Sequence, residues 1–122
     1  MVKGSGNSYF DSAVGSYQKG IALQREKFKE AKHHNNYDSM CDSIENIKSE
    51  IKQKMINKNM QNDLKKIERI TVWYRTKETQ CIKNTPEGKV VVFPPNFHNK
   101  INHNLTIAYE IIIKSLDLLE LL

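Results

Sequence analysis

The stretch INHNLTIAYEIIIKSLDLLELL, residues 101–122, decides the fold that this sequence can adopt. Its apolar residues recur in steps of three and four, which is the spacing of one face of an α-helix. Further apolar residues flank that face, and only Glu110, Lys114, Asp117 and Glu120 interrupt it with charge. A helix that is apolar around most of its circumference needs cover on more than one side. We therefore expect a central helix here, with other helices packed around it.

Three earlier stretches have the one-faced apolar spacing of ordinary amphipathic helices. They lie at about residues 8–32, 37–55 and 60–74, and the polar segments His33-His34-Asn35-Asn36 and Asn57-Lys58-Asn59 separate them. The pattern leaves the end of the third helix open, because Thr71-Val72-Trp73-Tyr74 has a strong strand preference. Short connections between amphipathic helices favour an antiparallel up-down bundle.

Residues 80–95 have a different character from the rest of the chain. Thr85-Pro86-Glu87-Gly88 is a turn sequence, and the run Val90-Val91-Val92 that follows it is β-branched. We expect either a short β-hairpin or an irregular insert in this region. The predicted fold class is all-α in the main, an antiparallel four-helix bundle. It forms a single domain over residues 8–122, after a flexible leader at residues 1–7.

Composition indicates one globular domain. The chain has 122 residues, of which 39% are hydrophobic and 27% charged, enough to bury a core without a metal or a disulfide. Cys41 and Cys81 lack a CxxC spacing and are expected to be reduced thiols. No stretch has the roughly 18 uncharged apolar residues of a membrane span, and the N-terminus lacks a secretory core. We expect a soluble, cytoplasmic protein.

Catalytic and metal-binding patterns are weak. Glu30-x-x-His33 has the spacing of a helix-bundle di-iron ligand pair, but such sites need a second motif and the sequence has none. His98 and His103 diverge on a helix, and both cysteines occupy apolar positions of helical patterns. Nucleophile elbows and phosphate-binding glycine loops are absent from the sequence. We expect no enzyme, no cofactor and no metal; the alternative is a site around Glu30, His33, Cys41 or His103.

The first functional hypothesis is a non-catalytic interaction or assembly module. The last helix offers more apolar surface than three one-faced helices can cover, and an uncovered remainder would bind a second copy or a helical protein partner. The alternative is that the bundle covers all of it. The candidate interface residues are Ile111, Ile113, Leu116, Leu118, Leu119 and Leu122.

The second hypothesis is nucleic-acid binding. The net charge is +5, and basic residues with interleaved aromatics can neutralise phosphates and stack on bases. The alternative is a solvated helix face, because Asp63, Glu68 and Glu78 dilute the stripe. A structural protein of a phage, virus or plasmid would combine this stripe with the apolar interface. The candidate residues are Lys65, Lys66, Arg69, Trp73, Arg75 and Lys77, assisted by Lys27, Lys29 and Lys32.

Overall fold

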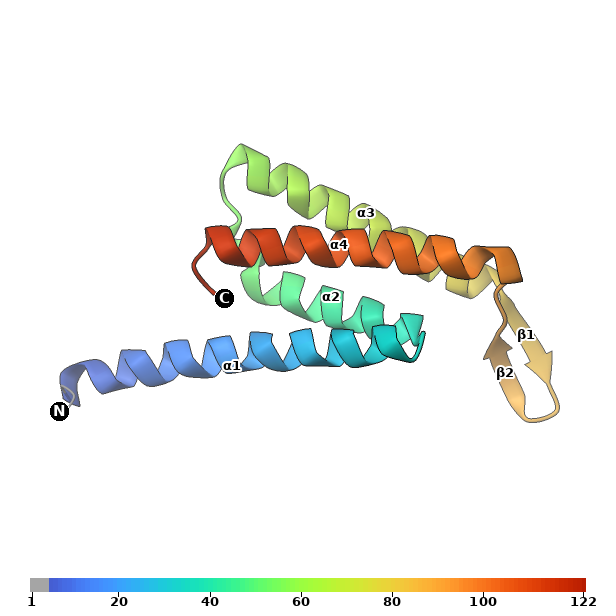
Figure 1. The fold of residues 1–122 in the computed structure, drawn as a ribbon, viewed down its shortest axis with the longest axis horizontal. Helices are drawn as coiled ribbons and strands as arrows, with labels where there is room; N and C mark the ends of the chain where they lie inside the picture. Colours follow the sequence, from blue (N-terminus) through green and yellow to red (C-terminus); the bar gives the residue numbers. More distant parts are fainter. Residues whose placement is uncertain (1–4) are drawn as a thin grey trace.

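The computed structural model describes the backbone of residues 5–122 and the side chains of residues 18–122. Within these residues it confirms the predicted fold, four helices with a two-stranded hairpin between the third and the fourth. The helices run alternately up and down along one axis (Figure 1). The elements are α1 (Ser5–His33), α2 (Tyr37–Ile51), η1 (Lys52–Lys54), α3 (Lys58–Gln80), β1 (Ile82–Thr85), β2 (Gly88–Val91), η2 (Pro95–Phe97) and α4 (His98–Leu118).

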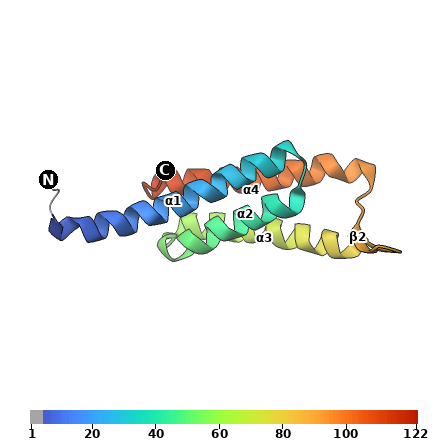
Figure 2. The same cartoon turned by 90° about the horizontal axis from the view of Figure 1, so that it is seen from below.

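Helix α1 begins earlier than the apolar pattern indicated. Of the leader expected at residues 1–7, residues 1–4 lie outside the described residues, and the helix starts at Ser5. It has 29 residues against 15 in α2, which is a difference of about 20 Å at 1.5 Å per residue. Its N-terminal part therefore extends past the end of the bundle, as Figures 1 and 2 show.

Helix α2, rather than the predicted last helix, packs against all three other helices, whereas the main partners of α4 are α2 and α3. Helix α1 also reaches α4, because the rings of Phe28 and Tyr109 stack with centroids 3.8 Å apart and planes 2° apart. The predicted apolar face of α4 is completely covered along most of its length. Its buried apolar residues, all 0% exposed, are Ile101, Leu105, Ala108, Ile112 and Leu116.

The connections follow the turn chemistry of the sequence. Asn35 takes a positive φ of 53°, and the Asn36 side chain caps α2 by accepting from the Ser39 N–H at 3.2 Å. Asn57 caps α3 in the same way, accepting from the Met60 N–H at 2.9 Å. An Asn side chain at this position satisfies one of the free N–H groups of the first helical turn. The first predicted loop thus lies between α1 and α2, apart from His33, which ends α1. The second prediction was wrong for Lys58 and Asn59, which form the start of α3, because the helix begins directly after its cap Asn57.

Helix α3 continues through the segment with strand preference. Thr71 and Tyr74 are 3% and 1% exposed, so burial against the core outweighs their local preference. The Thr71 hydroxyl donates to the carbonyl of Glu68 at 3.1 Å, which satisfies it inside the bundle. The helix ends only at Gln80.

The hairpin projects from the far end of the bundle (Figure 1). Ile82 pairs with Val91 and Thr85 with Gly88. Gly88 has a φ of +122°, a conformation that residues with a Cβ rarely adopt. Phe93, just after the hairpin, anchors it, with its ring centroid 6.0 Å from that of Tyr74.

Candidate functional site

Helix α3 keeps its acidic side chains on the inner side. Asp63 forms an ion pair with Lys114 of α4 at 3.6 Å. Glu68 accepts from Lys48 of α2 at 3.0 Å and lies 3.7 Å from Lys52 of η1. The remaining acid of this helix, Glu78, belongs to the cluster described next. Two of the acids that dilute the basic stripe in the sequence thus bind cations of neighbouring elements instead.

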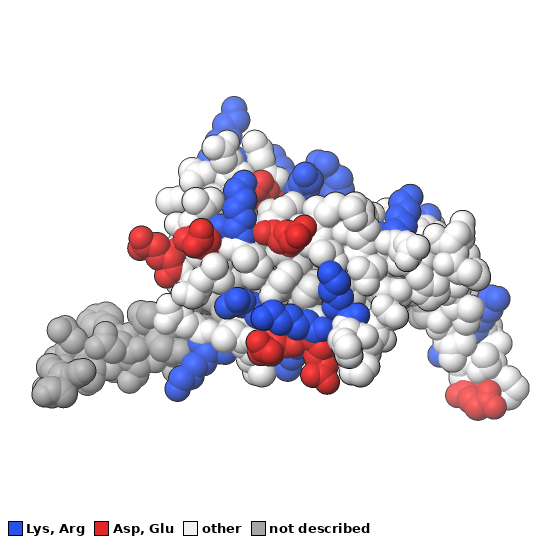
Figure 3. Space-filling view, in the orientation of Figure 1, with Lys and Arg blue, Asp and Glu red and all other residues white. Residues whose placement is uncertain are grey.

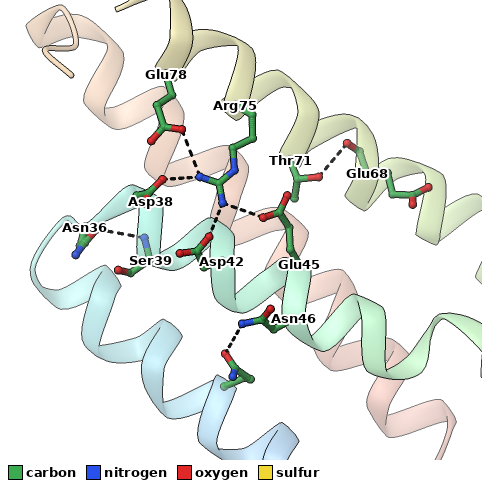
Figure 4. A network of polar contacts seen from close by, with 11 residues as sticks. Asn36, Asp38, Ser39, Asp42, Glu45, Asn46, Glu68, Thr71, Arg75 and Glu78 are labelled. Atoms are coloured by element: carbon green, nitrogen blue, oxygen red, sulfur yellow. Dashed lines mark hydrogen bonds and ion pairs between the residues drawn. The ribbon is translucent and has the colours of Figure 1, made fainter. Parts of the chain in front are cut away.

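Arg75 joins α3 to α2 through four carboxylates (Figure 4). Its guanidinium binds Asp38 and Asp42, lies 2.8 Å from Glu45, all on α2, and lies 3.4 Å from Glu78 on its own helix. The arginine side chain is 31% exposed. An arginine held in this way is not available to a phosphate. Arg75 must therefore be removed from the predicted nucleic-acid stripe.

The pKa values of Asp38 and Glu78 are shifted in opposite directions within this cluster. Burial raises the pKa of Glu78, and its hydrogen bond to Asp38 raises it further. The same hydrogen bond lowers the pKa of Asp38, with the Arg75 charge contributing in the same direction. Two adjacent carboxylates repel each other when both are ionised, so one of them holds its proton to a higher pH. We therefore expect the contribution of this cluster to stability to depend on pH.

The outer side of α3 is basic. Lys65, Arg69, Trp73 and Lys77 follow one another in steps of four, so they share one face of the helix. Figure 3 shows Lys and Arg side chains along the upper edge of the molecule, where α3 lies. Within the part of the chain whose side chains are described, none of these cations forms an ion pair. The basic side chains of this outer face are Lys58, Lys65, Lys66, Arg69 and Lys77.

An aromatic pair lies at the hairpin end of this face. The rings of Trp73 on α3 and Phe97 on η2 have centroids 6.0 Å apart and planes tilted by 53°. Lys100, in the first turn of α4, places its Nζ 5.8 Å from the centroid of each ring. Lys77 places its Nζ 5.4 Å from the Phe97 centroid. Both rings are half-buried and pack against the core on one side.

Sequence reasoning missed part of this cluster. Phe97 and Lys100 lie 24 and 27 residues after Trp73, and only the packing of α4 and η2 beside α3 brings them to it. The position of Arg75 away from the stripe, in contrast, could have been predicted from the sequence. Arg75 stands two residues after Trp73, and side chains two apart on a helix point to nearly opposite sides.

The predicted apolar interface is divided, with one residue buried, three partly buried and two exposed. Leu116 is 0% exposed and must be removed from the interface, because α4 buries it in the core of its own chain. Ile111, Ile113 and Leu119 are partly buried and pack against that core. The exposed members are Leu118 and Leu122, at 58% and 52%. The bundle itself thus covers part of the α4 surface that the first hypothesis left open for a partner.

The residues proposed for an enzyme or metal site do not come together. Glu30 lies 3.9 Å from His34, and the described residues hold no group of three or more His, Cys, Asp or Glu able to bind a metal ion. Cys41 is 0% exposed, and burial raises the pKa of its thiol to about 12. His98 hydrogen-bonds the Tyr37 hydroxyl at 3.0 Å, while His33 and His103 are exposed.

A hollow lined by residues of α1, α2 and the loop between them lies in the described part of the chain. It has a volume of about 770 Å³, is open to solvent, and is lined by acidic and basic side chains together, including Glu26, Lys27 and Asp42. Mixed charge and an open shape offer little to fix one small ligand. The distinctive surface of this molecule is therefore the outer face of α3.

The fold and this face together define a four-helix bundle with one cationic, aromatic-tipped helix. No family model, curated protein or solved structure matches the chain. Among the described helices, none is both long enough and apolar enough to span a membrane.

Proposed function

We propose that this protein binds nucleic acid through the outer face of α3. The observation that carries the proposal is the separation of charge on this helix: Asp63, Glu68 and Glu78 bind cations on the inner side, whereas the lysines and Arg69 of the outer side stand without ion pairs among the described side chains. Lysine and arginine that are not paired within the protein can neutralise phosphates and release the counterions condensed on them. That release drives binding.

The dimensions of the face suit an extended polyanion. Lys58 and Lys77 are 19 residues apart on one continuous helix, which corresponds to about 28 Å at 1.5 Å per residue. Cations spread over that length of one helix can contact several successive phosphates of one strand. The expected signature is an affinity that falls steeply with salt, since each phosphate contact adds nearly one to the slope of log K against log salt.

The test removes three charges from α3. The triple variant Lys65→Gln, Lys66→Gln, Arg69→Gln is titrated against a fluorescent oligonucleotide at low and moderate salt, with anisotropy as the readout. We expect at least a tenfold loss of affinity and a salt slope reduced by about two to three. The matched control removes the same charge from α1, with Lys27→Gln, Lys29→Gln and Lys32→Gln.

The control distinguishes binding at the α3 face from binding that depends only on the net positive charge. The sequence suggested that these lysines assist binding, but α1 packs against α2 rather than α3, and Lys29 is paired with Glu26 at 3.6 Å. We therefore expect the α1 variant to retain most of the affinity. Equal losses in both variants would mean that only net charge matters, and a wild-type protein that binds no oligonucleotide would overturn the proposal.

Self-association is a second candidate, favoured by apolar side chains at one end of the bundle. Leu118 and Leu122 are exposed there, and Ile56, in the connection from α2 to α3, is 77% exposed. Acidic Asp117 and Glu120 accompany the leucines, whereas basic Lys58 follows Ile56. Such a surface is self-complementary, since a two-fold axis would set the acidic side of one copy against the basic side of the other.

The experiment for this second candidate is the solution mass by light scattering. If this end is an interface, Leu118→Asp with Leu122→Asp converts an oligomer to a folded monomer. Val72→Asp is the control, because Val72 is 63% exposed on α3 and distant from that end. A wild-type mass of 14.2 kDa at all concentrations would exclude self-association.

A further inference from the structure

We infer that the nucleic acid is single-stranded, with an unpaired base stacked on the Trp73–Phe97 pair. The inference rests on the proposed function and adds the class of nucleic acid to it. The two rings come from α3 and η2 and lie 6.0 Å apart between centroids. They stand at one end of the row of cations that the backbone of the strand would follow.

Both rings of the pair are partly exposed. Trp73 and Phe97 are half-buried and pack against the core, so part of each ring remains in contact with solvent. Trp73 shares its helix side with Arg69 and Lys77 rather than with buried Thr71 and Tyr74. A tryptophan that belonged only to the core would lie on the buried side of α3. Supported but accessible aromatic faces are what single-strand binding proteins offer to bases.

Two lysines flank the aromatic pair. Lys100 has its Nζ 5.8 Å from both ring centroids, and Lys77 has its Nζ 5.4 Å from that of Phe97. Long lysine side chains can turn from an aromatic face toward a phosphate while their carbon chains remain in place. The rings would bind the base of a nucleotide by stacking, while Lys77 and Lys100 would bind the adjoining phosphates.

A duplex cannot use this arrangement. Its bases are stacked on one another and present only their edges in the grooves, whereas an unpaired strand can turn a base onto an aromatic side chain. A polyanion without bases would engage only the cations. A single strand, a duplex and a polyanion without bases should therefore affect Trp73 differently. Its fluorescence can be followed directly, because Trp73 is the single tryptophan of the chain.

The experiment follows Trp73 fluorescence and affinity with three probes: an oligothymidylate of about 20 nucleotides, a duplex of the same length, and inorganic polyphosphate. We expect the oligothymidylate to quench the fluorescence and the other two probes to leave it nearly unchanged. Trp73→Leu should weaken oligothymidylate binding about tenfold or more, and Trp73→Phe should retain most of the affinity. Neither variant should change the affinity for polyphosphate.

Phe97→Leu is a second variant, used in case the substitutions at Trp73 disturb folding. Phe97 lies on the short η2 turn, and this variant keeps Trp73 as the fluorescent probe. It should weaken oligothymidylate binding and reduce the quenching. Equal quenching by the duplex, or unchanged affinity in both Trp73→Leu and Phe97→Leu, would overturn the single-strand inference. If the Lys65, Lys66 and Arg69 triple variant still weakens binding in that case, the proposed function stands. If that triple variant binds every probe normally, the proposed function fails as well.

Discussion

Arg75 of α3 and Glu45 of α2 lie 2.8 Å apart, from Nη2 to Oε1, and this pair is one arm of a guanidinium bound by four carboxylates. The other three are Asp38, Asp42 and Glu78. One cation thus offsets four acids. Without it, the acids would repel one another at the junction of the two helices.

Replacement of Arg75 should destabilise the bundle. Arg75→Ala removes a charge-assisted network from a side chain that is 31% exposed, and we expect a loss of about 1–3 kcal/mol in the free energy of unfolding. Arg75→Lys should recover only part of it, because an ammonium lacks the planar fork. Urea unfolding at neutral pH measures both. Arg69→Ala is the control and should stay within about 0.5 kcal/mol of wild type; an equal loss there would contradict the assignment.

Glu78→Gln should stabilise the protein at neutral pH. The pKa of Glu78 is raised above its ordinary value of 4.5. Its proton therefore favours the folded state below pH 4.5, and that contribution is lost as the pH rises through the folded pKa. Glutamine resembles the protonated acid at every pH. The gain over wild type should be present at pH 7 and vanish near pH 4, as urea midpoints across this range would show.

Asp38→Asn should show the opposite pH dependence. The pKa of Asp38 is lowered from its ordinary value of 3.8, so the ionised form favours folding above that pH. Its contribution disappears as the pH falls through the lowered pKa. The variant should therefore be less stable than wild type at pH 7 and approach it in strong acid. A constant difference at all pH values would contradict the lowered pKa of Asp38.

The two cysteines should react at very different rates. Cys41 is completely buried, and burial raises its pKa to about 12, so little reactive thiolate forms at pH 8. Cys81 is half-exposed at the end of α3. A thiol reagent should modify one cysteine in the native protein and both in urea. Cys81→Ser should abolish the native reaction, and rapid labelling of that variant would show that Cys41 is accessible.

A pair of substitutions on α4 compares a buried position of this helix with an exposed one. Ile112 is 0% exposed and Leu118 is 58% exposed on the same helix. Ile112→Ala should cost about 2–5 kcal/mol, the range for emptying a packed core position. Leu118→Ala should stay within about 0.5 kcal/mol of wild type. Thermal or urea unfolding compares the two directly, and similar losses would contradict the described burial.

The sequence predicted the architecture because apolar spacing depends only on neighbours along one helix. Ile101, Leu105, Ala108 and Ile112 are all buried as that spacing indicated. The end of α3 could not be fixed in the same way. Thr71 and Tyr74 have local strand preference, and only burial against other helices makes them helical.

The candidate site was less predictable, because it depends on contacts between distant segments. Whether Asp63 dilutes the basic stripe depends on Lys114, 51 residues later, which binds it at 3.6 Å. The pairing of Trp73 with Phe97 likewise requires the position of α4 beside α3. Leu116 shows the same limit, since its spacing allowed both a core and an interface, and only the packed bundle decides for the core.

The sorting of charge on α3 also affects how the molecule would meet its partner. Because the acids of α3 are paired with cations on the inner side, the cations of the outer side leave an uncompensated positive charge on that face. A polyanion within a Debye length, about 8–10 Å at physiological salt, would exert a torque that turns α3 toward it before contact. This orientation would raise the association rate, and a rise in salt should slow the association of protein and strand.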